Sequence, residues 1–450
     1  LRTIPEVTAL QSYVGTASPF NFNGMVRHYY LRQKAWEADI QVMLLDKDDR
    51  SRSSHEIAEA ARALLTPVAQ KAGAKIAIVE MPPGPPVLQT MVAEVYGPSQ
   101  ETRQQVARDM ERMFIEAPGL VDVDTYMSDE SMRWHFDVDI EKATRHGVSV
   151  EAINRNLAMA MGGQRLGDVK TGRMLEPTYL AIQLPMEIRS ELARLYILPI
   201  QMANGTTIPL SELGRFVAIQ EDQVLYHKDL RPMEYVVGEM EGKLGAPIYG
   251  MLAVEEQLDG YTSPDGVQIS GTLTGPPASD QMSGFEWSGE WVVTYETFRD
   301  MGIAFAAALV LIFILLVWEF GNYIHPAIIM APIPLTLIGI VPGHWIMDAE
   351  FTATSMIGFI ALAGIEVRNS ILLVDFARNE VSRGVSFKDA VIEAGKIRMR
   401  PIWVTTLTLM AGAFAILFDP IFEGMAISLL FGPIIAVPLT MLVVPLGCVS

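Results

Sequence analysis

Four polar residues interrupt an apolar segment near the end of the chain, and their types could do chemistry. The stretch GIEVRNSILLVDFA, residues 364–377, contains Glu366, Arg368, Asn369 and Asp375 among aliphatic side chains. Ionisable side chains inside a membrane helix are costly, so they usually face the interior of a helix bundle or a water-filled path. We therefore interpret Arg368 as part of an ion-coupling network. A buried cation that only holds helices together is the alternative.

The two carboxylates of this segment lie in different positions relative to the arginine. Asp375 comes seven residues after Arg368, which places it two helical turns away on nearly the same face. Because Asp375 lies near the end of the apolar run, a simple role at the membrane interface is an alternative for it. Glu366 precedes Arg368 by two residues and points almost oppositely, so it needs a separate partner or a neutral form.

The next apolar run carries hydroxyl groups just inside its start. The stretch RPIWVTTLTLMAGA, residues 400–413, contains Thr405, Thr406 and Thr408. These hydroxyls form a polar stripe that could face the charged segment. Threonines in membrane helices also serve simply in helix packing or by bonding to backbone carbonyls of their own helix, and that alternative stays open.

The sequence contains no pattern that is typical of an active site. The motifs GxGxxG, P-loop, HExxH and GxSxG are absent, and the seven histidines are scattered without ligand spacing. Paired aspartates on expected strands, Asp122 with Asp124 and Asp137 with Asp139, are typical of a solvated strand face. The sequence therefore predicts no catalytic residue, no cofactor and no metal centre, and an enzyme is the least favoured class.

The distribution of charge divides the chain into two parts. Half of the 450 residues are hydrophobic, yet the long apolar runs lie after about residue 300. The net charge of −18 falls mainly before that point, which argues against nucleic acid as the partner. Cys448 is the only cysteine, so no disulfide can form within the chain.

Five apolar runs are long enough to cross a membrane, which takes about 20 residues. Five such runs, joined by short connections, indicate a membrane domain rather than buried core helices. The runs lie near residues 301–320, 325–347, 353–377, 401–418 and 423–447.

The charges between these runs predict their orientation. The connection 378–400 has an excess of Lys and Arg and is expected on the cytoplasmic side, whereas 348–352 and 419–422 contain only acidic charges. Residues 1–300 then lie outside the cytoplasm. Because no span or export signal precedes them, we expect a portion of a larger polypeptide. An interfacial aromatic belt before the first span is predicted from Trp287, Trp291 and Tyr295.

The first 300 residues show a repeated strand–helix–strand pattern. The first copy has a strand at 37–46, a helix with capping-box spacing at Ser53 and Glu56, and a strand at 74–81. The second copy runs from 90 to 127. The repetition predicts ferredoxin-like modules.

Two further stretches of the first 300 residues predict local structure. The stretch MPPGPPVLQ, residues 81–89, predicts a stiff connection between the copies because four prolines exclude a helix. A β-hairpin is expected at an Asn204-Gly205 turn.

Several of these stretches together resemble the resistance–nodulation–division (RND) superfamily of exporters, in its hydrophobe/amphiphile efflux branch. The strongest match is residues 364–412, with a Gly, a basic residue before Asn369, an acid, the pair Phe-Ala and a Thr-rich helix. The segment FDVDIEKATRHGVSVEAINRNL, 136–157, resembles the family's docking segment, and FEWSGE, 285–290, the stretch before a membrane span. The resemblance covers the C-terminal half of a typical member.

The resemblance implies a membrane protein of α+β class. It has a first porter subdomain at 1–86, a second at 87–133 and 230–289, a docking subdomain at 134–229 and a transmembrane domain at 290–450. It further implies a homotrimer, or pairing with the missing N-terminal half, in the bacterial inner membrane. A periplasmic adaptor protein and an outer-membrane channel are the implied partners, and no nucleic acid is expected.

The resemblance also assigns a proton relay position by position. The relay lysine falls on Arg368, the relay threonine on Thr405 and the relay arginine at the cytoplasmic end on Arg398, while Asn369 matches the Asn beside the lysine. Glu366 and Asp375 are accessory intramembrane charges. Because arginine keeps its charge where lysine can lose it, we interpret Arg368 as a fixed counter-charge for an acidic pair on a helix absent from this chain.

The expected function is therefore proton-driven export of hydrophobic or amphiphilic compounds. Metal-ion efflux of the copper or silver type is an alternative, and it predicts methionines that face one another in the porter cleft. Most of the 25 methionines fall at apolar helix positions, which favours packing. A scaffold or accessory subunit of protein export, without transport activity of its own, is a further alternative.

Overall fold

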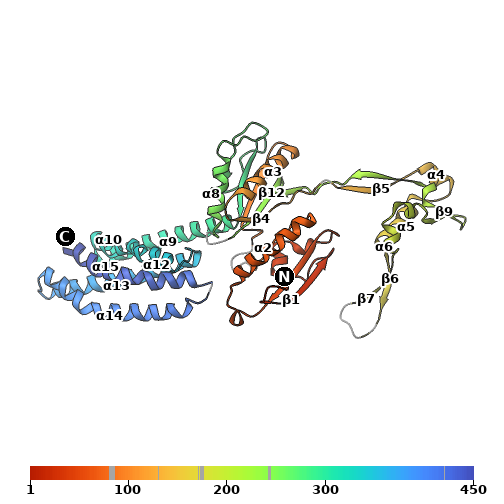
Figure 1. The fold of residues 1–450 in the computed structure, drawn as a ribbon. Coiled ribbons are helices and arrows are strands. Elements are labelled where there is room, and N and C mark those ends of the chain that lie inside the picture. The colour runs from red at the N-terminus through yellow and green to blue at the C-terminus, as the bar shows by residue number, and fades with distance from the viewer. Residues whose placement is uncertain are drawn as a thin grey trace. The chain divides into compact units, whose positions relative to one another are not determined.

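The computed structural model describes most of the chain. The described residues are 1–80, 87–129, 131–170, 172, 177–241, 245–419 and 421–449. They form two compact units, one of residues 127–226 and one of residues 1–126 together with 227–450 (Figure 1). The boundaries predicted for the porter and docking subdomains stay predictions.

The first module of the larger unit is a two-stranded sheet with one long helix. Strand β1, Val7–Val14, pairs antiparallel with β2, Ala38–Leu44, and helix α2 spans Ser54–Ala72. The predicted capping box is confirmed, because the Ser53 side chain accepts from the Glu56 N–H and the Glu56 side chain accepts from the Ser53 N–H. Three short elements complete the module: α1, Phe22–Val26, η1, Tyr29–Leu31, and η2, Lys47–Asp49.

The strand predicted at 74–81 is wrong for its described residues, 74–80, which form neither strand nor helix. Its backbone is bound by side chains instead of by a strand ladder. The Ile78 N–H donates to the Asp122 carboxylate over 3.0 Å. The connection predicted at 81–89 falls mostly outside the described residues, which resume at 87.

The second module is a six-stranded sheet whose four longer strands are antiparallel and have ferredoxin-like topology, as predicted. Its order β4–β12–β3–β14 places β12 between the strands of the first strand–helix–strand unit and β3 between the strands of the second. The stacked rings of Phe114 and Trp287 lie in its core. The strands are β3, Met91–Tyr96, β4, Leu120–Thr125, β12, Arg231–Met240, and β14, Gly284–Gly289, with short β11, Tyr226–Lys228, and β13, Gly271–Thr272; the helices are α3, Gln100–Glu116, and α8, Pro247–Leu258.

The smaller unit has a core of its own around Ile153, Ile200 and Leu213. The hairpin predicted at Asn204-Gly205 is confirmed, with Gly205 in the left-handed region at φ 86°. The strands are β5, Met132–Val138, β6, Gln164–Val169, β7, Thr178–Ile182, β8, Pro199–Gln201, β9, Thr207–Pro209, and β10, Gly214–Gln220; the helices are α4, Ile140–Arg145, α5, Val150–Gly162, α6, Met186–Arg189, α7, Leu192–Tyr196, and η3, Leu210–Glu212.

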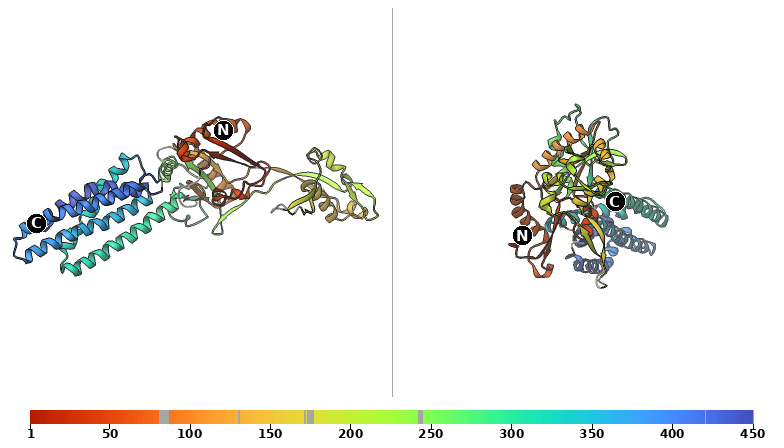
Figure 2. Two further views of the ribbon diagram at one scale, coloured as in Figure 1. Left: turned by 90° about the horizontal axis from the view of Figure 1, so that it is seen from below. Right: turned by 90° about the vertical axis from the view of Figure 1, so that its right-hand side faces the viewer.

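The last third of the chain forms a helix bundle, and the five predicted apolar spans are confirmed by length and composition. In Figures 1 and 2 the long helices of this part, coloured from green-blue to blue, run alongside one another. The elements are α9, Glu290–Phe320, the interrupted span of α10, Ile324–Met330, α11, Pro332–Leu335, and α12, Leu337–Ile346, then α13, Ala353–Ser382, α14, Phe387–Ile416, and α15, Glu423–Val449.

Glycines allow the helices of this bundle to approach closely. A Cβ atom at Gly432 of α15 would lie 2.3 Å from a Leu362 methyl carbon of α13. One at Gly343 of α12 would lie 2.5 Å from the Phe431 side chain. Small residues at such crossings are a common way to pack membrane helices, and here they allow α13 and α12 to pack closely against α15.

Two predictions about the ends of the spans are wrong. The connection expected at 378–400 is mostly helical, because α13 continues to Ser382 and α14 begins after Ser386, whose side chain caps it by accepting from the Asp389 N–H. Trp287 does not belong to an interfacial belt. It is buried in β14, where its indole N–H donates to Glu255 over 2.8 Å.

Candidate functional site

Helix α13 exposes Arg368 on one face, within a recess shared with α14. The open recess has a volume of about 270 Å³, and it is lined by Arg368, Thr405, Thr408 and three apolar residues, Ile365, Val404 and Leu409. The structure thus brings Arg368 and Thr405 together. The described residues that line the recess include no carboxylate, so they offer the arginine no counter-charge.

The threonine hydroxyls of α14 bond to their own helix. Thr405 Oγ1 donates to the carbonyls of Ile402 and Pro401, at 2.9 and 3.2 Å, and Thr408 Oγ1 donates to Val404 O over 2.8 Å. Each hydroxyl oxygen keeps its lone pairs available to accept a hydrogen bond from the recess. Thr406 faces the other way and is buried.

The opposite face of α13 contains Glu366, which is 0 % exposed. Its Oε2 accepts a hydrogen bond from the Thr440 hydroxyl of α15 over 2.8 Å, so the structure provides the separate partner that its position requires. Its Oε1 is buried and makes no hydrogen bond within the described part of the chain. Asn369 and Ser370, one turn further along the same face, are also buried.

The other two predicted charges lie towards the C-terminal end of α13. Asp375 is exposed, and the Asn379 amide donates to its carboxylate over 3.4 Å. Arg398 of α14 is partly buried, with its guanidinium 5.4 Å from the centre of the Phe376 ring. Neither side chain lines the recess of Arg368 and Thr405, so the structure does not bring all predicted site residues together.

A second recess, of about 230 Å³, lies at this same end of the bundle. His325, Arg378 and Cys448 line it together with apolar residues and Asn322. The Asn322 side chain bonds to His325 Nδ1 over 2.6 Å, so the imidazole is fixed by a local contact. None of the residues predicted for ion coupling lines this recess.

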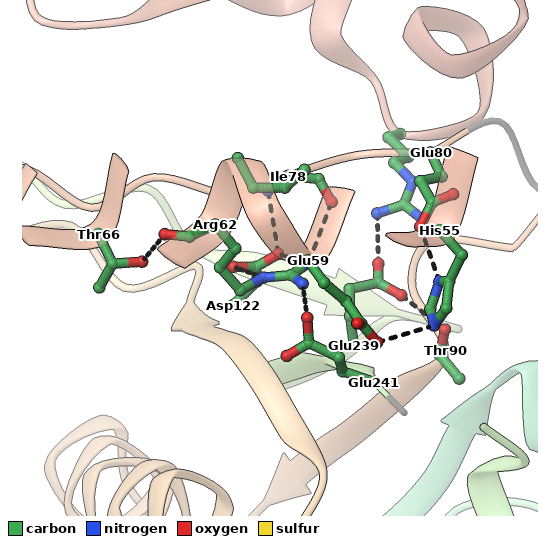
Figure 3. Close-up of polar contacts among 11 residues, drawn as sticks. His55, Glu59, Arg62, Thr66, Ile78, Glu80, Thr90, Asp122, Glu239 and Glu241 are labelled. Carbon is green, nitrogen blue, oxygen red and sulfur yellow. Dashed lines mark hydrogen bonds and ion pairs between the residues drawn. The ribbon is translucent and has the colours of Figure 1, made fainter. Parts of the chain in front are cut away.

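An arginine of α2 joins the first and second modules of the larger unit (Figure 3). Arg62 donates to both oxygens of Asp122, at 3.2 and 2.9 Å, and pairs with Glu241. Burial lowers the pKa of Arg62, but the hydrogen bonds and charges of Asp122 and Glu241 outweigh it, so the pKa lies above its ordinary value. Sequence reasoning missed this contact.

The interpretation of Asp122 as a solvated strand residue is therefore wrong. Its side chain is 4 % exposed, and its backbone is in the left-handed region at φ 51°. The available signal was Arg62 itself, because it follows the buried Ala58 by four residues and so lies on the inward face of α2. A cation on that face requires an acceptor.

Further ion pairs lie beside this contact. Figure 3 shows His55 between Glu59 and Glu80, with nitrogen–oxygen distances of 3.5 and 3.0 Å. Glu239 of β12 pairs with Arg27 and accepts from the Thr90 hydroxyl over 2.6 Å. Of these pairs, the one between Arg27 and Glu239 also links the first module to the second.

Comparison with known proteins decides the family. A sequence model of the AcrB/AcrD/AcrF family matches residues 6–447. The chain belongs to the AcrB/AcrD/AcrF family. The predicted membership of the RND superfamily and the predicted fold class are confirmed. Members of this family are transporters rather than enzymes, and the chain is a multi-pass membrane protein.

Individual relatives are distant and longer. The chain is 24% identical over 359 residues to swarming motility protein SwrC of Bacillus subtilis, an alignment that covers 78% of this chain and 32% of SwrC. It is 24% identical over 306 residues to multidrug resistance protein MdtC of Proteus mirabilis, which covers 68% and 28%. The matched region thus spans about a third of these relatives.

The fold agrees with solved structures of a heavy metal efflux pump. Two crystal forms match 99% of this chain and 44% of the pump chain, with 19% identity and TM-scores of 0.73 and 0.76. At this identity the likeness establishes the fold. Among the described residues, no group of three or more His, Cys, Asp or Glu side chains is arranged to hold a metal ion.

Proposed function

We propose that this chain is the C-terminal half of a proton-driven exporter of hydrophobic or amphiphilic compounds. The observation that carries the proposal is the recess of α13 and α14, where Arg368 and Thr405 lie together and none of the described lining residues supplies a counter-charge. An intramembrane cation on an open face requires an acidic partner from another segment. Proton binding to that partner is then a means of changing the packing of the helices.

The coupling step follows from the chemistry of arginine. The guanidinium of Arg368 stays charged, so it attracts partner carboxylates while they are ionised and releases them when they are protonated. The carboxylates come from a helix outside residues 1–450. Thr405 supplies a hydroxyl oxygen beside the arginine, and Arg398 acts towards the cytoplasmic end of α14. Asn369 and Asp375 support the path.

The soluble part provides the moving cleft in this proposal. Residues 1–86 and the discontinuous segment 87–133 with 230–289 are two porter subdomains, and 134–229 is the docking subdomain. The ion pairs of Arg62 and Arg27 join the two porter subdomains, and they are the contacts that a movement of one subdomain against the other would have to break. The assembly is a trimer in the inner membrane with an adaptor and an outer-membrane channel.

Metal-ion export is the second candidate, and the likeness to a heavy metal efflux pump favours it. It requires methionine sulfur atoms that face a cleft. Met91 and Met251, in contrast, are buried in the core of the second module, at 1% and 2% exposure. The relatives named multidrug resistance proteins favour export of small organic molecules.

Transport by the complete protein tests the proposal. Cells that lack the protein are complemented with wild type or with Arg368→Ala, and accumulation of a fluorescent amphiphilic dye and of copper is measured with and without an uncoupler. We expect dye export that the uncoupler abolishes and that Arg368→Ala loses. Copper export without dye export would support the second candidate. Export of neither compound would support the scaffold role.

A further inference from the structure

Glu366 is enclosed entirely by helices of this chain. Its side chain is fully buried, whereas Arg368, two residues further on, is exposed on the other side of α13. A helix that packs on the Arg368 face can therefore reach the arginine but not the glutamate. The environment of Glu366 is set by α13, α15 and their neighbours alone.

The polar surroundings of Glu366 are incomplete. The Thr440 hydroxyl donates to Oε2, while Oε1 is buried without a hydrogen-bond partner in the described structure. Asn369 and Ser370 follow at the i+3 and i+4 positions, which share the face of Glu366 on a helix. Asn369 Nδ2 and Ser370 Oγ are buried and likewise form no hydrogen bond to any described residue.

Few charges act at the depth of Glu366. On α15 the described titratable residues are Glu423 and Cys448, at the two ends of the helix. His344 of α12 contacts Ser355, three turns away along α13. The charged or titratable residues of α9 and α10 are Glu290, Glu296, Arg299, Asp300 and Glu319 on α9 and His325 on α10; the charged residues of α14 are Lys388, Asp389, Glu393, Lys396, Arg398 and Arg400, all in the first half of that helix. Arg368 is the nearest cation in sequence, and it faces away.

We propose that Glu366, with Thr440, Asn369 and Ser370, forms a proton-binding site inside this helix bundle, distinct from the recess of Arg368. In the packed arrangement the carboxyl group carries a proton on Oε1, because a buried carboxylate with one bare oxygen and no cation beside it is costly. Loss of the proton to water leaves the carboxylate, which needs further donors. Asn369 Nδ2 and Ser370 Oγ are the unused donors within one turn.

The ligand is a proton rather than a metal cation. A cation needs several oxygen ligands and a space of its own, and Glu366 lines neither of the two recesses described in the bundle. A proton needs no volume. No redox partner is required, since one O–H bond forms at the carboxyl and the proton comes from and returns to water.

The site deepens the proposed function and rests on it for its role in transport. Arg368 cannot exchange a proton, whereas Glu366 on the same helix can. Proton loss from Glu366 would leave a carboxylate that can accept from Thr440 of α15 and from the unused donors of α13 together, and so change the contact between the two helices.

Infrared difference spectroscopy of the complete protein in lipid tests the site without measuring transport. A protonated carboxylic acid has a carbonyl stretching band that is separate from the carboxylate bands. We expect such a band at neutral pH, its loss at alkaline pH, and its absence in Glu366→Gln. Glu380→Gln, an amide substitution near the C-terminal end of the same helix, where Glu380 pairs with the exposed Arg383, should leave the band unchanged.

A second variant covers the case in which Glu366→Gln fails to fold. Thr440→Val keeps the carboxyl but removes its hydrogen bond, so the band should shift to higher frequency. No Glu366-dependent band at any pH, a band that persists at alkaline pH, or an unchanged band in Thr440→Val would each overturn the proposal. The same band should be observed in the Arg368→Ala protein. Loss of transport coupling and loss of the proton site are therefore distinguishable.

Discussion

Glu366 and Arg368 lie two residues apart on α13 and face opposite sides of it. Glu366 is fully enclosed and bonded to Thr440, whereas Arg368 lines an open recess beside Thr405. One helix thus presents a carboxyl group to its own bundle and a cation to a face that the described helices leave uncovered. This arrangement separates what α13 does within the chain from what it offers to another segment.

Arg368 should be required for proton-coupled export, and lysine should replace it in part. We expect Arg368→Ala to reduce uncoupler-sensitive dye efflux at least about tenfold, because the partner carboxylates lose their counter-charge. Arg368→Lys should retain efflux with a changed pH profile, since lysine can lose its proton. The matched control is Arg383→Ala, at the exposed end of the same helix, which should behave as wild type.

Thr405 should contribute to coupling but little to stability. Its hydroxyl bonds only to carbonyls of its own helix, so Thr405→Val removes no contact between helices. We expect efflux to fall several-fold, while the thermal unfolding temperature in detergent stays unchanged. Thr408→Val is the matched comparison, because Thr408 lies one turn further along α14 in the same recess. Equal, small effects of both variants would show that back-bonding is the only role of these hydroxyls.

Local patterns predicted most of the fold. Apolar runs gave the five spans, the repeated strand–helix–strand pattern gave β3, α3 and β4, and Ser53 with Glu56 gave a helix start. Predictions failed where long-range contacts replace local ones. The segment at 74–80 follows a strand pattern, but Asp122 and Arg62 bind its backbone at Ile78.

The candidate site was only partly readable from sequence. Helical periodicity separates Glu366 from Arg368, and it places Asp375 on the exposed side. It does not identify Thr440, because residues 366 and 440 meet only through the packing of α13 on α15. A hydroxyl between prolines in an otherwise apolar run was the available signal. The described residues that line the recess of Arg368 include no carboxylate, so the proposed acidic partner could not be predicted from this sequence.

Arg62 should hold the first module to the second. Removing one member of a buried ion pair leaves the other without a partner and typically costs about 3 kcal/mol. We therefore expect Arg62→Ala to expose residues 74–80, whose backbone it helps to bind, to faster amide hydrogen exchange. Arg112→Ala, which removes an exposed arginine paired with Asp109, should change exchange at 74–80 little. Unchanged exchange at 74–80 in Arg62→Ala would contradict this role.

Glu234 should make the second module less stable as the pH rises. Burial raises the pKa of this β12 carboxyl above its ordinary value, against the opposing charges of Arg103 and Arg108. A raised folded-state pKa means that the stabilising contribution is present in acid and is lost as the pH rises through it. Glu234→Gln should therefore slow amide exchange in β12 several-fold relative to wild type at neutral pH, and the difference should vanish in acid. The exposed Glu256→Gln is the control, and an equal effect there would contradict the assignment to burial.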